Sequence, residues 1–289
     1  MTSLLRLMSR CPLWLLHGLG ALLGWLTWLA SPTYRHRFRA QVMTAGVPWA
    51  RARGAIAQAG RMVAEAPWLW LRPPQQPLGK RVSWDGAELI DAALAQGRGL
   101  VLLTPHLGCF EVTAQAFAER YGHQWPVTVL FRPARKAWMR ELVAGSRDRP
   151  GLSAVPATLA GVRQMLRALR QGQAVGLLPD QVPPEGLGVW APFFGRPAYT
   201  MTLAAKLAQQ SGAPIVCVWG DRLSWGRGFV VRARPGPQIA RDSTPESAAT
   251  QINQAMEQMI LDAPQQYLWG YHRYKNPRAL DLGQTGQAD

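Results

Sequence analysis

A histidine and a glutamate lie close together in the segment Gly99–Glu111, which reads GLVLLTPHLGCFE. The residues Leu100–Thr104 are apolar or small, and such a run has the length of a buried strand rather than of a helix. Pro105 ends the run because proline has no N–H for a sheet ladder. His106 therefore follows directly after a predicted strand, which is where α/β sheets hold their reactive groups.

The spacing His106-x4-Glu111 is the first candidate for catalysis. On one continuous helix the two side chains would lie about 140° apart, because a helix has about 3.6 residues per turn. They meet only if the chain turns between them, and Gly108 permits such a turn. A carboxylate that orients and polarises an imidazole makes a general base for activating a hydroxyl. One such match also arises by chance, so other motifs must support it.

The cysteines leave a second chemistry open in the same segment. Cys109 lies between the histidine and the glutamate, and it is either a thiol nucleophile or a small apolar core residue. The other two cysteines, Cys11 and Cys217, are scattered along the chain. They form no CxxC pair and no disulfide framework, which favours a reducing compartment and predicts no metal site.

Composition limits the class of protein and the kind of partner. The chain has 289 residues, 48% of them apolar and 17% charged, which suits one large globular domain with or without an appendage. Its 32 Lys and Arg against 17 Asp and Glu give a net charge of +15. Such a surface favours phosphate, nucleic acid, acidic protein or anionic lipid as partner. The 13 tryptophans are typical of a membrane interface.

The segment Cys11–Ala30 predicts a membrane-anchoring helix. It contains no Asp, Glu, Lys or Arg, and as a helix it would be about 30 Å long, the thickness of a bilayer core. Gly20 and Gly24 form a GxxxG helix-packing signal. A signal peptide is disfavoured because no small-x-small cleavage site follows. The arginines beyond residue 34 indicate a cytoplasmic body, and a helix lying in the membrane interface is the alternative pose.

Three parts are expected along the chain: a transmembrane or interfacial helix at 1–31, a helical connector at 32–80 and an α/β domain at 81–289. The residues 33–71 are amphipathic and predict helix. Beyond them strands alternate with helices, which predicts a mostly parallel central sheet flanked by helices. The strands are expected at 82–84, 100–104, 127–131, 174–178, 215–219 and 229–232. The helices are expected at 86–96, 110–121, 135–146, 158–171, 202–211 and 245–261.

Three further segments carry candidate binding residues. Arg132 and Arg135 follow a predicted strand and form either an anion clamp or a solvated basic loop. The residues 178–197 lack periodicity and predict a long functional loop, in which Asp180 suits substrate positioning and Phe193 with Phe194 suits an apolar slot. The residues 266–275 alternate aromatic and cationic side chains, which fits a nucleic-acid stacking surface or an interfacial belt.

The order of these motifs resembles the lipid A biosynthesis (late) acyltransferases, within the lysophospholipid acyltransferase superfamily. The similarity extends over nearly the whole chain, including the apolar N-terminal helix. It implies that His106 and Glu111 form the catalytic dyad, with Glu in a position where the family often has Asp. The residues that the resemblance places at the substrate are Arg132, Arg135, Asp180, Gln181, Phe193, Phe194 and Arg196.

The implied reaction moves a fatty acyl chain from acyl-carrier protein, or from acyl-CoA, to a hydroxyl of an acylated glucosamine disaccharide. Because a thioester is already activated, no acyl-enzyme is needed, and the chain has no Gly-x-Ser-x-Gly elbow. A backbone N–H near Gly108 is the candidate oxyanion donor. No cofactor and no metal ion are expected.

The resemblance also implies partners and a location. We expect an acyl-carrier protein, a phosphorylated lipid acceptor and an anionic membrane surface, and no nucleic acid. The enzyme would sit at the inner membrane with its catalytic domain on the cytoplasmic face. Two alternatives remain: an acyltransferase of the same superfamily with another acceptor (lysophosphatidate, ornithine lipid or a glycolipid), or a non-catalytic protein that binds anionic lipid or nucleic acid.

Overall fold

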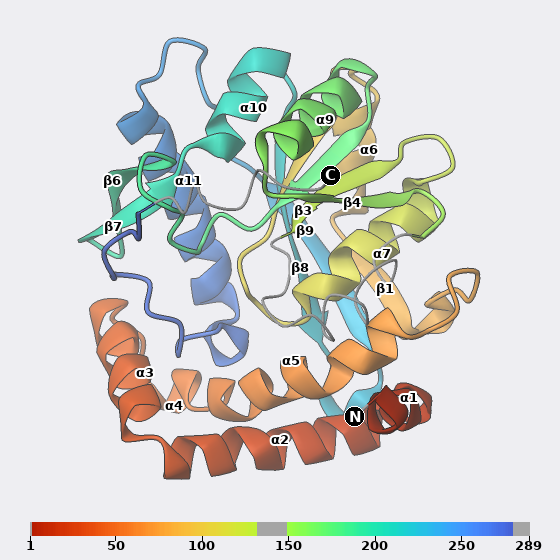
Figure 1. The fold of residues 1–289 in the computed structure, drawn as a ribbon, viewed down its shortest axis with the longest axis vertical. Helices are drawn as coiled ribbons and strands as arrows, with labels where there is room; N and C mark the ends of the chain where they lie inside the picture. The colour runs from red at the N-terminus through yellow and green to blue at the C-terminus, as the bar shows by residue number, and fades with distance from the viewer. Residues whose placement is uncertain (1, 132–148, 280–289) are drawn as a thin grey trace, which may run out of the picture.

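A seven-stranded sheet forms the centre of the computed structural model, which describes residues 2–131 and 149–279 (Figure 1). The strand order is β1-β9-β8-β2-β5-β3-β4. Neighbouring strands pair in parallel except β8 with β9, which confirms the predicted α/β class with a mostly parallel sheet. The strands are β1 (Val82–Asp85), β2 (Leu100–Leu103), β3 (Val127–Phe131), β4 (Leu152–Pro156), β5 (Ala174–Leu177), β8 (Ile215–Arg222) and β9 (Phe229–Pro235).

Helices cover both faces of this sheet, and the alternation of side chains along a strand explains why both faces are apolar. On one face Val101 and Leu103 of β2 share a buried cluster with α9, α10 and α11. On the other face Leu100 and Leu102 share a cluster with α6 and α7. These helices are α6 (Ala87–Leu94), α7 (Phe110–Tyr121), α9 (Leu159–Arg170), α10 (Leu203–Ser211) and α11 (Pro245–Asp262).

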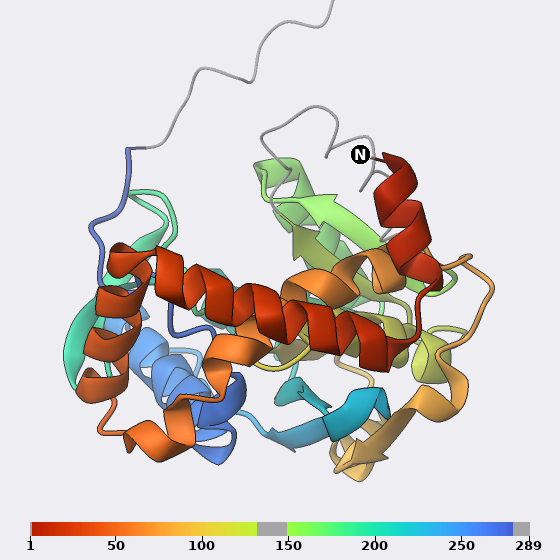
Figure 2. The same cartoon turned by 90° about the horizontal axis from the view of Figure 1, so that it is seen from below.

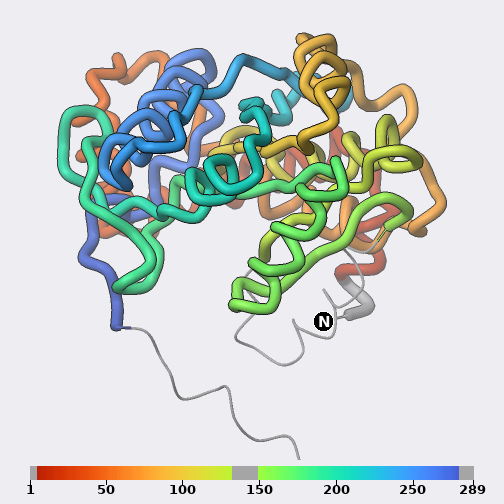
Figure 3. The backbone as a smooth tube through the Cα atoms, turned by 90° about the horizontal axis from the view of Figure 1, so that it is seen from above, coloured from red at the N-terminus to blue at the C-terminus, as the bar shows by residue number. Residues whose placement is uncertain are grey.

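The structure corrects the prediction of a long loop at 178–197. The second half of this segment belongs to an antiparallel hairpin of β6 (Gly188–Phe193) and β7 (Arg196–Met201), which lies on the opposite side of the molecule from α6 (Figure 3). Phe194 and Gly195 make its turn, both with positive φ, as two-residue hairpin turns require. The prolines inside both strands concealed them, and the strand β4 was not predicted either.

The N-terminal part is also more divided than predicted. Its helices are α1 (Thr2–Arg10), α2 (Leu13–Ala30), α3 (Pro32–Thr44), α4 (Trp49–Ala52) and α5 (Ala55–Trp70). The predicted single helix over 33–71 is broken because Gly46, with φ +64°, turns the chain before Pro48. The helix α1 was not predicted. The residues 135–146, predicted as helix, lie outside the described residues.

The helices α2 and α5 pack along each other beneath the sheet (Figures 1 and 2). Glycines allow this close approach: a Cβ on Gly24 would lie 2.2 Å from the carbonyl oxygen of Ile56, and a Cβ on Gly60 would lie 1.9 Å from that of Gly20. The predicted GxxxG signal is therefore used within the chain. Among the described residues, α2 is the one helix that is long and apolar enough to cross a membrane.

A buried ionic cluster joins these helices to the sheet. The Nε2 of His17 on α2 lies 3.1 Å from Oε2 of Glu65 on α5. The guanidinium of Arg222, at the end of β8, donates through Nε to the same oxygen at 2.8 Å and through Nη2 to Oε1 of Glu65. All three side chains are almost fully buried. The helix α2 is therefore an integral part of the fold rather than a tethered appendage.

Candidate active site

His106 lies beyond the carboxyl end of β2, as predicted, and its partner comes from the neighbouring strand. Because β2 pairs with β5, the residues that follow the two strands emerge at the same edge of the sheet. The Nδ1 of His106 lies 2.7 Å from Oδ1 of Asp180, and the backbone N–H of His106 donates to Oδ2 of Asp180 at 2.8 Å. Asp180 thus holds both the ring and the backbone of the histidine.

The electrostatics of this pair fix the tautomer of the ring. Burial alone raises the pKa of Asp180, but the charge and the hydrogen bonds of His106 outweigh it, so the pKa stays below its ordinary value. An ionised Asp180 only accepts hydrogen bonds, so Nδ1 of His106 carries a proton. In the neutral ring Nε2 then has the free electron pair, which is the state of a general base.

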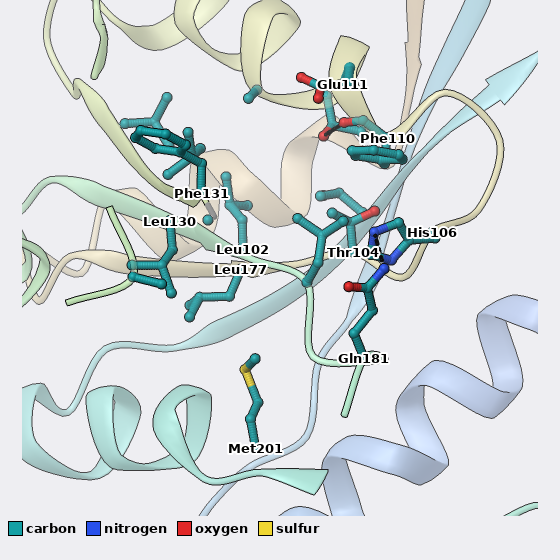
Figure 4. Close-up of a pocket in the computed structure, with 18 of the residues that line it drawn as sticks. Leu102, Thr104, His106, Phe110, Glu111, Leu130, Phe131, Leu177, Gln181 and Met201 are labelled. Carbon is teal, nitrogen blue, oxygen red and sulfur yellow. Dashed lines mark hydrogen bonds between the residues drawn. The ribbon is translucent and has the colours of Figure 1, made fainter. Parts of the chain in front are cut away.

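Gln181 and Phe110 complete the surroundings of the imidazole (Figure 4). The side-chain nitrogen of Gln181 lies 3.0 Å from Nε2 of His106, so its N–H donates to the electron pair of the ring. The ring of Phe110 packs against the imidazole with 4.8 Å between centroids. A substrate hydroxyl that reaches Nε2 must take the place that the amide of Gln181 holds here.

The imidazole borders a cavity of about 280 Å³. The cavity lies between β2, β3, β5 and the N-terminal turns of α7, and most of its wall is apolar. The apolar side chains in this wall include Leu102, Val129, Leu130, Leu177, Val182 and Met201. A reactive nitrogen at the rim of such a cavity suits a substrate with a hydrocarbon chain next to a polar reacting group.

Glu111 lines the same cavity from the first turn of α7. In Figure 4 its carboxylate and the imidazole of His106 point to different parts of the cavity, with the ring of Phe110 between them in this view. Phe110 and Glu111 also border a second apolar cavity of about 320 Å³, between α5 and α7. The carboxylate that contacts the imidazole is that of Asp180, which the predicted dyad did not include.

Other predicted residues occupy different places. Phe193 is buried in the core against Phe194, with 4.8 Å between the ring centroids, and neither lines the cavity at His106 in the described part of the chain. Arg196 lines a separate pocket beside α3. Arg132 and Arg135 lie outside the described residues.

The structure corrects the role predicted for Gly108. Its φ of +58° confirms the turn, but its N–H donates to the carbonyl of Gln266 at 3.0 Å and is not free for an oxyanion. The neighbouring N–H of Cys109 donates to the carbonyl of Gly220 at 2.8 Å. These bonds hold the His106 loop against β8 and the segment that follows α11.

Cys109 does not have the properties of a nucleophile. Its side chain is 1% exposed, and burial followed by the charge of Glu65 raises the pKa of the thiol well above its ordinary value. Reactive cysteines need a lowered pKa and access to the substrate. Cys109 is therefore a core residue, the second of the two interpretations that the sequence left open.

A histidine base with a carboxylate partner, at the carboxyl edge of an α/β sheet and beside an apolar cavity, defines the class of enzyme that activates a hydroxyl next to a lipid chain. The comparison with protein families specifies this class. The family model for the bacterial lipid A biosynthesis acyltransferases matches residues 42–276. The chain belongs to this family, which confirms the resemblance found in the sequence and supports acyltransferase activity. Membership is also compatible with an association with membranes.

Curated relatives are similar over a part of their length. A lipid A biosynthesis lauroyltransferase of Escherichia coli (strain K12) is 28% identical over 217 residues, 75% of this chain and 68% of the relative. A lipid A biosynthesis acyltransferase of Haemophilus influenzae is 26% identical over 192 residues, 66% of this chain and 58% of the relative. A phosphatidylinositol mannoside acyltransferase of Mycobacterium tuberculosis is 29% identical over 148 residues, 49% of this chain and 45% of the relative.

Proposed function

We propose that this protein transfers a fatty acyl chain from acyl-carrier protein to a hydroxyl of a lipid A precursor at the inner face of a cytoplasmic membrane. The observation that carries the proposal is the pair of His106 and Asp180, which leaves Nε2 of the imidazole at the rim of an apolar cavity. The acyl chain would lie in an apolar cavity next to this nitrogen.

The reaction needs one base and one departing thiol. As the acceptor hydroxyl displaces the amide of Gln181, Nε2 of His106 takes the hydroxyl proton while the oxygen attacks the thioester carbonyl. The new C–O bond gives a tetrahedral oxyanion, and its collapse breaks the C–S bond. The thiolate leaves with the proton that the imidazolium returns. The carboxylate of Asp180 stabilises the transient imidazolium, as the acid of a catalytic triad does.

Oxyanion stabilisation requires donors other than the N–H of Gly108. The displaced amide of Gln181 remains beside the reacting atoms, and we assign it this role because its N–H already points at Nε2. The N-terminal turn of α7 lines the same cavity, and the positive end of a helix favours a developing anion. Both features act where the charge appears in the transition state.

We assign Glu111 a role that differs from the one predicted from the spacing. Because Asp180 occupies Nδ1 of the imidazole, Glu111 would act through the cavity that it shares with His106, by orienting the acceptor or the donor. The two carboxylates thus have different roles: Asp180 fixes the tautomer of the imidazole, and Glu111 faces the substrate.

The net charge of +15 supports acidic acyl-carrier protein as donor and a phosphorylated lipid as acceptor, since complementary charge steers association. The apolar helix α2 supports the membrane location. A second acceptor class, a mannosylated phosphatidylinositol, is favoured by the 29% identity to a phosphatidylinositol mannoside acyltransferase.

A defined assay tests this proposal. Purified protein is incubated with acyl-carrier protein that carries a labelled acyl chain and with either a lipid A precursor or a phosphatidylinositol mannoside. The masses of the lipid products are measured by mass spectrometry. We expect an added acyl mass on the lipid A precursor with the wild-type chain and none with His106→Ala. Thioester that is not consumed by wild-type protein with either acceptor would refute the proposal.

A further inference from the structure

A separate pocket of about 200 Å³ has a cationic wall. The described residues that line it differ from those that line the cavity at His106. The cationic pocket is formed by α3, the start of β7 and the segment after α11. Among the described residues, its wall holds four basic side chains and no carboxylate. The basic residues are His36, Arg37, Arg196 and His272. None of the roles proposed for catalysis uses this pocket.

Contacts with an aromatic ring and with backbone carbonyls position the described wall of this pocket. The guanidinium of Arg196 lies over the ring of Tyr274, 4.7 Å from its centroid, and the hydroxyl of Tyr274 donates to the carbonyl of Phe193 at 2.9 Å. The amide of Gln41 on α3 donates to the backbone carbonyls of Trp269 and Tyr271. These bonds fix α3 against the C-terminal segment, and the ring of Tyr274 positions the guanidinium of Arg196.

The charges in this pocket repel one another. Burial lowers the pKa of His272, and the neighbouring Arg37, Lys275 and Arg196 lower it further. A nearby carboxylate, Glu257, accepts from the backbone N–H of Phe194 at 2.7 Å and does not line the pocket. A cluster of guanidinium and imidazole groups with no carboxylate among its described lining residues favours an anion, and arginine suits phosphate in particular.

The position of the pocket indicates which kind of phosphate-bearing molecule would bind there. One face of α2 exposes apolar side chains to the outside although the opposite face is packed on α5. The exposed side chains are Trp14, Leu19, Leu22, Leu23, Trp25, Leu26 and Leu29. The helix ends at Ala30 and α3 begins at Pro32, with His36 and Arg37 one turn further on (Figures 1 and 2). The C-terminal end of α2 is therefore followed directly by the helix that carries two of the four cations.

We propose that this pocket binds the phosphodiester of an anionic phospholipid headgroup, while the acyl tails of the bilayer cover the exposed face of α2. An interfacial helix with cations at its border binds membranes in this way. Since α2 is packed along α5 over its length, it lies in the plane of the interface instead of crossing the bilayer. The inference concerns membrane docking and stands whether or not the proposed acyl transfer is correct.

Vesicle flotation with the full-length protein tests this site. Vesicles of phosphatidylcholine with phosphatidylglycerol are compared with vesicles of phosphatidylcholine alone. For the variant Arg37→Gln/Arg196→Gln we expect the affinity gained from phosphatidylglycerol to fall about thirtyfold, because each basic residue near an anionic surface contributes about fivefold. Binding to phosphatidylcholine alone, which depends on α2, stays within about twofold of the wild type.

A matched variant separates a site from general charge. Arg163 and Arg170 are exposed on α9, at the far side of the molecule from α2 and α3 (Figure 1), and Arg163→Gln/Arg170→Gln removes the same charge. We expect it to bind phosphatidylglycerol like the wild type, and Arg37→Lys/Arg196→Lys to retain most of the affinity. Equal losses in the two glutamine variants, or no loss in either, would overturn the proposal.

Two other ligands are outcomes of the same experiment. If Arg37→Gln/Arg196→Gln loses binding of inorganic phosphate but still binds phosphatidylglycerol vesicles like the wild type, the pocket takes a free anion and the headgroup assignment is wrong. If Arg37→Gln/Arg196→Gln binds phosphatidylglycerol normally but has a raised KM for a phosphorylated acceptor, the pocket holds the acceptor instead, which also overturns it.

Discussion

The described residues contain two histidine–carboxylate pairs with a buried carboxylate, and the pairs differ in what lies on the other side of the histidine. His17 and Glu65 join α2 to α5 at 3.1 Å, while His106 and Asp180 join the loops after β2 and β5 at 2.7 Å. In both pairs the carboxylate is almost fully buried. Glu65 has a second partner in Arg222, and His106 has an amide and a cavity beyond its Nε2.

This difference explains why one histidine–carboxylate pair stabilises the fold while the other can take part in catalysis. Around Glu65 the arginine and the histidine satisfy both carboxylate oxygens, and the ring of His17 packs edge-on against Phe229, so the cluster holds helices in place. Both carboxylate oxygens of Asp180 accept hydrogen bonds from His106. The other ring nitrogen, Nε2, faces the cavity and can act as a base. A buried histidine–acid pair is thus a candidate base only where the second nitrogen reaches a cavity.

The largest expected effect comes from removing the two histidines in turn. His106→Ala should lower kcat by about 10²–10⁴-fold, the usual contribution of a general base, with an unfolding temperature close to that of the wild type. His17→Ala should lower the unfolding temperature and leave kcat of the folded protein within about tenfold of the wild type. Acyl-transfer kinetics and thermal unfolding of both variants measure this, and a reversed pattern would end the distinction.

Removal of Glu65 should produce the largest loss of stability. Glu65→Ala leaves Arg222 buried without its carboxylate, and breaking a buried pair in this way costs about 3–5 kcal/mol in the free energy of unfolding. Denaturant unfolding measures it. The exposed Glu246→Ala, in the first turn of α11, is the control and should change the free energy by less than about 1 kcal/mol.

The two carboxylates near His106 are expected to differ in kind. Asp180→Asn should lower kcat by up to about 10⁴-fold, as the same change does in a catalytic triad by favouring the wrong tautomer of the ring, and should alter the pH dependence of kcat. Glu111→Gln should raise KM more than it lowers kcat if it faces the substrate. Steady-state kinetics across pH separate them; an altered pH profile in Glu111→Gln alone would restore the dyad predicted from the spacing.

Acid should weaken the structural pair gradually. Burial raises the pKa of Glu65, but Arg222 and then His17 outweigh this and bring it from 4.5 to about 2. Its ionised form therefore contributes stability above pH 4.5, and this contribution is lost as the pH falls toward 2. Unfolding free energies measured through this window should fall more steeply for the wild type than for Glu65→Gln, and parallel curves would contradict the assignment.

The sequence predicted the sheet class, both ends of α7 and the place of His106 because short apolar runs and their stops are local signals. It did not predict that β5 lies next to β2, since strand order depends on packing over long distances, and so the contact of His106 with Asp180 was missed although both residues were singled out. The strand β6 was hidden by Pro192, and the loss of Gly108 as a donor followed from Gln266, which is distant in the chain.

The bond between Glu65 and Arg222 spans 157 residues of sequence. During synthesis α2 and α5 leave the ribosome long before β8 exists. Until β8 is made, Glu65 has no arginine to neutralise it, and the packing of α2 on α5 lacks this ion pair. The N-terminal helices can therefore form this contact only after β8, which begins at residue 215 of 289, has been made. Fragments that end before β8 should accordingly not reproduce the folded N-terminal helices. Truncations that remove α2 should disturb the end of β8 around Arg222.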